Sequence, residues 1–128
     1  MTSVSDDRPI VVVLAEDEVL LRMLAVNALE EEGFVAIEVG SAIAALDIVK
    51  ARADDVDVLF TDIRMPGPMD GLELAHRVRE RWPAISVVIT SGNLFVPAHE
   101  LPAGTRFLPK PYDMRRVVDL IRELRGHQ

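Results

Sequence analysis

Residues 56–71 read VDVLFTDIRMPGPMDG, and this stretch decides the fold. The largely apolar run Val56–Phe60 is typical of a buried strand, and Asp62 lies where that strand ends. Met65 and Pro66 open a turn rich in glycine and proline, which cannot continue a strand. Most aspartates at such a place cap the next turn, so Asp62 alone is a weak indication of chemistry.

Four further strands alternate with helices along the rest of the chain. The strands are predicted at Ile10–Leu14, Phe34–Val39, Ile85–Thr90 and Arg106–Leu108. The helices are predicted after Glu18 to about Glu32, from Ser41 as N-cap to Arg52, from about Gly71 to Arg81, and from Asp113 as cap to about Arg125. Between residues 91 and 104 prolines and glycines allow only a short or distorted fourth helix, near Phe95–Leu101.

Five strand–helix units predict an α/β domain with an open, doubly wound parallel sheet in the flavodoxin-like order 2-1-3-4-5. They are too few to close a (β/α)₈ barrel. The 128 residues, 49% of them apolar and 27% charged, suit one domain over residues 9–125, with a disordered leader at 1–8 and a tail at 126–128. No apolar run approaches the ~20 residues of a membrane-spanning helix.

The charge and the cysteine count narrow the function. A net charge of −7 speaks against nucleic-acid binding and favours cations and proteins as partners. The chain has no cysteine, which excludes disulfides and thiol catalysis and suits a reducing cytoplasm.

Polar side chains follow several of the predicted strands. In the order 2-1-3-4-5 the first and third strands are neighbours, so Glu16 and Asp17 come close to Asp62. Three carboxylates in one pocket repel one another unless a cation joins them, although residues 16–18 would also stabilise a helix N-terminus through its dipole. The loops offer no histidine or cysteine, so Mg²⁺ is favoured over zinc.

Thr90 and Lys110 end the fourth and fifth strands. Taken singly they suit a turn hydroxyl and a surface lysine, and Lys110–Pro111 is a candidate cis peptide. Together with Asp62 and a divalent cation they make an acyl-phosphate site, in which Asp62 attacks in line while the cation and Lys110 neutralise phosphoryl oxygens.

Four motifs resemble the receiver domain of bacterial two-component response regulators. They are LAEDE at 14–18, DIRMPGPMDGLELA at 62–75, VVITSG at 87–92 and FLPKPYD at 107–113. The resemblance implies that Asp62 is the phosphoacceptor and that Mg²⁺ is held directly by Asp17, more indirectly by Glu16, and by the backbone carbonyl of Arg64. It also implies that Thr90 and Lys110 hold the phosphoryl group and that Phe107 is the switch aromatic.

The resemblance further implies a mechanism and a set of partners. A sensor histidine kinase or a histidine phosphotransfer protein offers phosphohistidine, and the new charge on Asp62 draws in Thr90 and lets Phe107 rotate. A downstream protein then reads the altered surface. The expected molecule is a stand-alone receiver, cytoplasmic, a monomer or weak dimer without a nucleic-acid or membrane partner, and an enzyme only for its own phosphorylation and dephosphorylation.

Two other functions fit the same fold. A receiver-fold interaction scaffold would not respond to phosphate, but the joint presence of Asp17, Asp62, Thr90 and Lys110 speaks against it. A Mg²⁺-dependent phosphohydrolase would need a second acid or base near Asp62, and the sequence shows none.

The chain departs from the family's pattern at two places. The loop from Asp62 to Gly71 is one residue longer than the commonest spacing, and the weak helix at 91–104 argues against the family's usual dimer through that face. The first helix adds a further feature, because Val19, Met23 and Val26 are apolar on its predicted outer side. They form a candidate docking patch, opposite a core stripe of Leu20, Leu21, Leu24, Ala25, Ala28 and Leu29.

Overall fold

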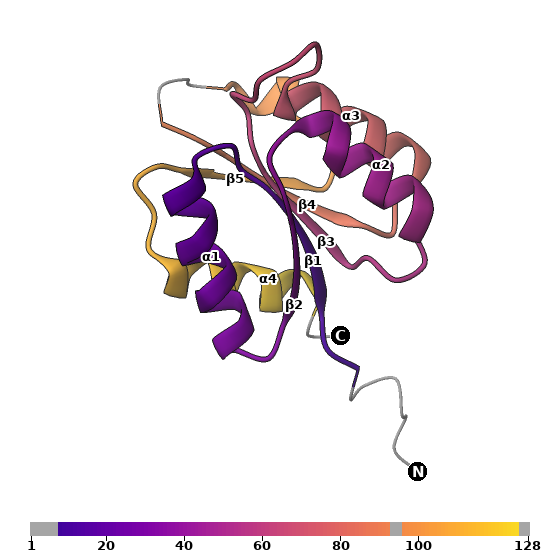
Figure 1. The fold of residues 1–128 in the computed structure, drawn as a ribbon. Helices are drawn as coiled ribbons and strands as arrows, with labels where there is room; N and C mark the ends of the chain where they lie inside the picture. The colour runs from indigo at the N-terminus through magenta and orange to yellow at the C-terminus, as the bar shows by residue number, and fades with distance from the viewer. Residues whose placement is uncertain (1–7, 93–95, 126–128) are drawn as a thin grey trace.

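A computed structural model describes residues 8–92 and 96–125, and Figure 1 shows its arrangement. Five parallel strands form one sheet in the order β2-β1-β3-β4-β5, which confirms the predicted topology. The strands are β1 (Val11–Ala15), β2 (Val35–Val39), β3 (Val58–Asp62), β4 (Ser86–Ser91) and β5 (Thr105–Pro109). Their carboxyl ends share one edge, where Ala15 pairs with Thr61 and Asp62 pairs with Thr90.

Helices cover both faces of this sheet. They are α1 (Val19–Glu31), α2 (Ala42–Arg52), α3 (Gly71–Arg81) and α4 (Met114–Arg125), with α1 and α4 on one face and α2 and α3 on the other (Figure 1). Side chains alternate along each strand, so Leu59 packs into the core under α2 and α3 while Phe60 packs into the core under α1 and α4. The central strands are therefore apolar on both faces, as in other buried parallel sheets.

The ends of the predicted strands differ from the observed ones by up to two residues. The strand expected at Val56–Phe60 runs over Val58–Asp62, because the amide of Val56 still donates to the carbonyl of Arg52 in the preceding turn. At its other end the strand includes the polar Thr61 and Asp62, which pair in the ladder with β4. An apolar run in the sequence indicates which residues are buried, but the ends of a strand are defined by its hydrogen bonds to the neighbouring strands.

Helices with clear caps lie where the sequence places them. Ser41 accepts a hydrogen bond from the amide of Ala44 at 3.1 Å at the start of α2. Asp70 accepts from the amide of Glu73 at 2.9 Å, and α3 then runs over Gly71–Arg81 as predicted. Gly33, with φ of 87°, follows the end of α1.

The predicted core stripe of α1 is wrong in part. Ala25 and Leu29 are buried, but Leu20 and Leu24 are 68% and 54% exposed. Val26, which we expected on the outer side, packs against the core under α1 and α4. Both sides of this helix are apolar, so the periodicity of the sequence could not decide which side faces the sheet.

The connection between β4 and β5 contains no α-helix among its described residues, 96–104. Its regular part is one turn of 3₁₀ helix, η2 (Ala98–Glu100), which agrees with the expected short or distorted helix; the predicted range Phe95–Leu101 begins outside the described residues. Side chains of α3 hold this connection. Nε2 of His76 lies 3.0 Å from the carbonyl oxygen of Glu100, and Nε of Arg79 donates to the carbonyl of Ala103 at 2.9 Å.

The amino-terminal end of the sheet carries a separate ion-pair cluster. Asp57 is buried there, and its carboxylate accepts two hydrogen bonds from Arg8, at 2.8 and 3.1 Å, and one from the amide of Val11 at 2.9 Å. Arg125, near the end of α4, lies 3.4 Å from the same carboxylate. Residues 1–7 of the predicted leader and the predicted tail 126–128 lie outside the described residues.

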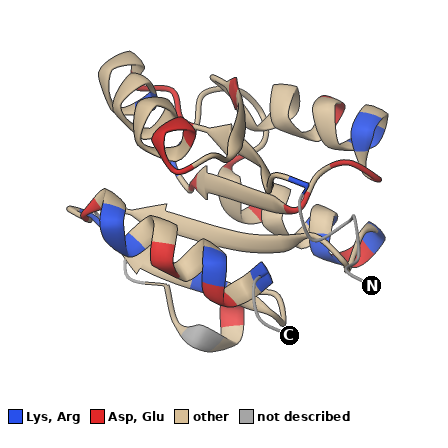
Figure 2. Cartoon of the chain, turned by 90° about the horizontal axis from the view of Figure 1, so that it is seen from below, with Lys and Arg blue, Asp and Glu red and all other residues tan. Residues whose placement is uncertain are grey.

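Charged residues of both signs alternate along α4 (Figure 2). Arg122 pairs with Glu32 of the α1 end at 2.9 Å, and Arg115 lies 3.9 Å from Asp119. The basic residues of α4 are thus partly neutralised within the chain. Among the described residues, no helix has both the length and the apolar content needed to cross a membrane.

Candidate functional site

Three carboxylates meet at the carboxyl edge of the sheet. Glu16 and Asp17 follow β1, Asp62 ends β3, and oxygen atoms of the three side chains all lie within 4.8 Å of one another. Glu16 and Asp62 are buried, whereas Asp17 is exposed. The neighbouring positions of β1 and β3 bring these residues together, as the strand order predicted.

The carboxylate of Asp62 is held from two sides. Its Oδ2 accepts a hydrogen bond from Nζ of Lys110 at 2.5 Å, and its Oδ1 accepts a longer one from the amide of Arg64 at 3.3 Å. The side chain is only 8% exposed. A carboxylate fixed in this way presents a defined oxygen to an incoming electrophile.

Glu16 is buried beside this pair. Its Oε2 accepts a hydrogen bond from the amide of Glu18 at 3.0 Å, and its Oε1 lies 3.6 Å from Nζ of Lys110. Burial raises the pKa of the Glu16 carboxyl, and the hydrogen bond from Glu18 and the charge of Lys110 oppose that shift without cancelling it.

Lys110 follows β5 and points its ammonium group between Glu16 and Asp62. Its amide donates to the carbonyl of Ser91 at 3.0 Å, and the Lys110–Pro111 peptide is cis, as the sequence suggested. Burial lowers the pKa of Lys110, but the hydrogen bond and the charge of Asp62 outweigh burial, so the pKa is raised. The lysine therefore stays charged at neutral pH.

Thr90 lies across from Asp62 at the end of β4. Its hydroxyl oxygen is buried and has no hydrogen-bond partner among the described residues. A buried hydroxyl without a partner is unfavourable, so this group would gain from a hydrogen-bond acceptor brought to the site. Phe107 of β5 pairs in register with Ile89, next to Thr90, and is half-buried against the core under α2 and α3.

Gly71 lies against the backbone of Asp62, and the sequence did not predict this contact. A Cβ atom at Gly71 would lie 1.8 Å from the carbonyl oxygen of Asp62 and 2.9 Å from Oγ1 of Thr61. The amide of Gly71 also donates to the carbonyl of Ile63 at 2.8 Å. Only a residue without a side chain allows the start of α3 to approach β3 so closely. The signal in the sequence was the glycine itself, at the start of the predicted helix.

Tyr112 is a second residue that sequence reasoning missed. Its ring contacts Phe60 edge to face, with the centroids 5.7 Å apart. Burial raises the pKa of its phenol to about 12, and the charge of Glu16 adds to the shift. Tyr112 thus joins the apolar core to the charged site.

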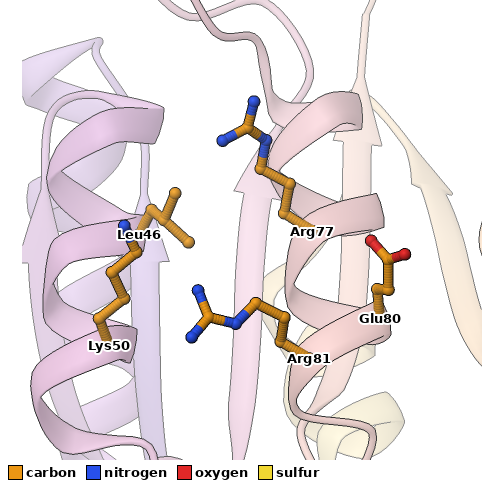
Figure 3. Close-up of a pocket in the computed structure, with 5 residues that line it drawn as sticks. All are labelled: Leu46, Lys50, Arg77, Glu80 and Arg81. Carbon is orange, nitrogen blue, oxygen red and sulfur yellow. The ribbon is translucent and has the colours of Figure 1, made fainter.

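Hollows lie on two sides of the charged cluster. One of about 440 Å³ is lined by Asp17, Ile63, Arg64, Met65, Pro66 and Asp70. A more apolar one, of about 390 Å³, is lined by Leu21, Gly92, Lys110, Pro111 and Tyr112. A third hollow of about 260 Å³ lies elsewhere, between α2 and α3, and is lined by Leu46, Lys50, Arg77, Glu80 and Arg81 (Figure 3).

The donor atoms of the cluster fit a hard divalent cation. Carboxylate oxygens and water suit Mg²⁺, and the three-residue cluster contains no histidine or cysteine that would favour zinc. Arg64 lines the same hollow as Asp17, so its backbone is close to the cluster. Of the predicted docking residues on α1, Val19 and Met23 are 59% and 54% exposed, while Val26 is partly buried against the core under α1 and α4.

Comparisons with known proteins agree on one family. The sequence profile of the response regulator receiver domain matches residues 12–122. The chain is 35% identical over 118 residues to the sensor kinase CckA of Brucella abortus, covering 88% of this chain but 12% of the kinase. It is 31% identical over 116 residues to the response regulator receiver protein CpdR of Brucella abortus, covering 88% of this chain and 94% of CpdR.

Solved structures give the same result. A response regulator receiver protein from Sinorhizobium medicae superposes with a TM-score of 0.85 at 28% identity, covering 91% of this chain and 94% of the other. The receiver domain of the hybrid histidine kinase CckA superposes with a TM-score of 0.77, also at 28% identity, covering 89% of this chain and 97% of the other.

Proposed function

Because the chain belongs to the response regulator receiver domain family, we propose that it is a phosphorylation switch whose acceptor is Asp62. The observation that carries this proposal is the buried carboxylate of Asp62 with Lys110 at 2.5 Å and the unpartnered hydroxyl of Thr90 across the strand pair. These groups supply a nucleophile, a countercharge and a free hydrogen-bond donor at one place.

The transfer step follows from this arrangement. One carboxylate oxygen of Asp62 attacks the phosphorus atom of a phosphohistidine, a P–O bond forms, and the P–N bond breaks with its electron pair left on the imidazole. The ammonium group of Lys110 neutralises negative charge on the phosphoryl oxygens. Water later hydrolyses the acyl phosphate, so the chain acts only on its own phosphorylation and is no enzyme for an external substrate.

A magnesium ion belongs to the proposal. Glu16, Asp17, Asp62 and the backbone carbonyl of Arg64 would hold it, and when bound it supplies positive charge that offsets both the carboxylates and the phosphoryl group. The carboxylate cluster supports this assignment, since three acidic side chains within 4.8 Å of one another face a single lysine.

Thr90 and Phe107 provide the switch. The hydroxyl of Thr90 has no hydrogen-bond partner within the described part of the chain, so it moves toward the new acceptor oxygens on Asp62. That movement changes the space beside Phe107, which is half-buried one strand away and can rotate inward. The chain thus has two arrangements of Thr90 and Phe107, and phosphorylation changes the free-energy difference between them in favour of the second.

We place the docking surface for the phosphodonor on α1. The exposed apolar residues there are Val19, Leu20, Met23 and Leu24, so the proposed surface keeps Val19 and Met23 of the predicted patch and has Leu20 and Leu24 in place of Val26. Leu21 of the same helix lines the apolar hollow with Tyr112, beside Lys110. A contiguous apolar surface next to the acceptor suits the helices of a sensor histidine kinase or histidine phosphotransfer protein. The chain would meet such a donor in the cytoplasm.

A substitution on α1 tests this docking surface. Met23→Asp should slow phosphotransfer from the cognate kinase but leave phosphorylation by acetyl phosphate unchanged, since a small donor needs no protein contact. Ile43→Asp, at an exposed apolar position of α2, is the matched control and should change neither rate. Equal slowing with both donors would place Met23 in the site rather than in docking.

The output surface is proposed to be non-standard. Residues 96–104 form one 3₁₀ turn in place of a regular helix, so a monomer or weak dimer is expected rather than the family's usual dimer through this face. The downstream partner is a protein that reads this region.

Intact mass spectrometry tests the main proposal. The chain is incubated with Mg²⁺ and acetyl phosphate. Asp62→Asn is the acceptor variant, and Asp70→Asn is the control, because Asp70 is an acidic residue that lines the hollow beside Asp17. One phosphoryl adduct should form in the parent and in Asp70→Asn, depend on Mg²⁺, and be absent from Asp62→Asn. No adduct in the parent, and no response to beryllofluoride, would favour a phosphate-independent scaffold.

A further inference from the structure

Arg22 of α1 connects the acidic turn to a neighbouring strand. Its side chain is 21% exposed and reaches back over the turn between β1 and α1. There Nη1 donates to the backbone carbonyl of Glu16 at 2.8 Å, and Nε donates to Oε1 of Glu38 on β2 at 3.1 Å. One guanidinium group therefore spans two elements.

The hydrogen bond from Arg22 adds to two others that hold Glu16 in place. The amide of Glu16 donates to the carbonyl of Val39 at 3.1 Å, and its carboxylate accepts from the amide of Glu18 at 3.0 Å. With Arg22 on the carbonyl, the backbone of Glu16 is held on both sides.

Asp17 depends on this backbone. Its carboxylate is exposed and makes no hydrogen bond or ion pair with the residues that the structure describes. The backbone that carries this carboxylate is placed by the peptide that joins Asp17 to Glu16, and Arg22 binds the carbonyl oxygen of that peptide.

Gly40 leaves room for the guanidinium group. A Cβ atom at Gly40 would lie 3.1 Å from Nη1 of Arg22, closer than ordinary packing. The φ angle of Gly40 is not positive, so alanine is tolerated by the backbone and would act only through this contact. Gly40→Ala would therefore crowd Nη1 of Arg22 by a few tenths of an ångström without changing any charge.

We propose that Arg22 is a positioning residue for the cation site, holding the Glu16–Asp17 peptide so that both carboxylates are ready to bind Mg²⁺. This inference rests on the proposed function, because it takes the carboxylate cluster as the magnesium site. Partners that hold metal ligands in place typically change metal affinity by about tenfold or more when removed.

Charge alone predicts the opposite sign. Arg22 is a cation beside an acidic cluster, so its positive charge weakens the attraction for Mg²⁺. If the residue acted only through its charge, its removal would tighten Mg²⁺ binding. If it positions the ligands, its removal weakens binding, and the direction of the change separates the two roles.

Isothermal titration of the unphosphorylated full chain with MgCl₂ is the test. Arg22→Gln should raise the dissociation constant for Mg²⁺ by about tenfold. Arg22→Lys keeps the charge but loses the two-pronged contact, so its dissociation constant should fall between those of Arg22→Gln and the parent. Gly40→Ala should weaken binding in the same direction. Arg52→Gln, which removes an equal charge from an exposed pair with Asp55, is the control and should bind as the parent does.

The outcomes separate this inference from the proposed function. Circular dichroism first establishes that each variant is folded at the titration temperature. If the parent binds Mg²⁺ and Arg22→Gln binds it equally or more tightly, the positioning role is wrong while the switch stands. If the parent itself binds no Mg²⁺, the positioning role of Arg22 and the proposed Mg²⁺-dependent switch are both wrong. Should Arg22→Gln fail to fold, Arg22→Lys decides, and a dissociation constant equal to the parent's in that variant would overturn the inference.

Discussion

The close contact between Gly71 and Asp62 makes a sharp prediction for Gly71→Ala. The added Cβ atom would lie 1.8 Å from the carbonyl oxygen of Asp62, whereas real Cβ atoms essentially never come within 3.0 Å of a neighbour. The start of α3 and the end of β3 must therefore separate by more than 1 Å. Overpacking of this kind lowers the free energy of unfolding by about 1–3 kcal/mol. A displacement of about 1 Å at the nucleophile can slow the reaction about 100-fold.

The assay compares two properties of the same variant. The rate of adduct formation with acetyl phosphate at saturating Mg²⁺ is followed by intact mass, and the free energy of unfolding is measured in urea. Gly67→Ala is the matched control, because Gly67 has φ of 99° with open space around its Cβ position. That variant should lose about 1–2 kcal/mol through backbone strain alone and keep the parental rate.

The reasoning is refuted if Gly71→Ala is phosphorylated as fast as the parent. It is also refuted if Gly67→Ala is slowed to the same extent, since the rate would then follow general stability rather than the position of Asp62.

Two further predictions concern groups around the core. Tyr112 is the single tyrosine of the chain, so absorbance at 295 nm should show its phenol half-ionised at about pH 12 instead of 10. Because the folded pKa is the higher one, the stability linked to this phenol is present below pH 10 and is lost as the pH rises toward 12, and a midpoint near 10 in the folded chain would contradict the burial argument. Asp57→Ala should lower the free energy of unfolding in urea by about 2 kcal/mol, because it leaves Arg8 and the buried amide of Val11 without their acceptor. Its phosphorylation rate should match the parent, since Asp57 precedes β3 and Asp62 ends it; a slower rate would show that the two ends are coupled.

The sequence was sufficient for the topology and for the gathering of the charged residues. Buried strands read as apolar runs, and the carboxyl ends of neighbouring parallel strands meet at one edge, so Asp17, Asp62 and Lys110 could be placed near one another before any coordinates. Helix α3 was predicted at about Gly71–Arg81 because Pro83 follows its end, and the structure adds the cap by Asp70 at its start.

Contacts between helices and strands could not be predicted from the sequence. The side of α1 that faces the sheet was predicted only in part, since Ala25 and Leu29 are buried as expected whereas Leu20 and Leu24 are exposed. An apolar residue such as Leu24 suits a core or an exposed patch equally well. The roles of Arg22 and Gly71 depend on which backbone lies within 3 Å of them, and that is decided by how α1 and α3 pack. Periodicity describes one element at a time and carries no information on such distances.

The irregular course of residues 96–104 sets how much structure must rearrange when the chain switches. Val96 and Leu101 cover the core there, and the segment is held to α3 through carbonyl contacts with His76 and Arg79. A regular helix would have to move as a unit, and all its buried side chains would have to repack. Residues 96–104 can instead separate from α3 when a few exposed hydrogen bonds break. We therefore expect residues 96–104 to rearrange faster than a regular helix would, because fewer contacts must break together.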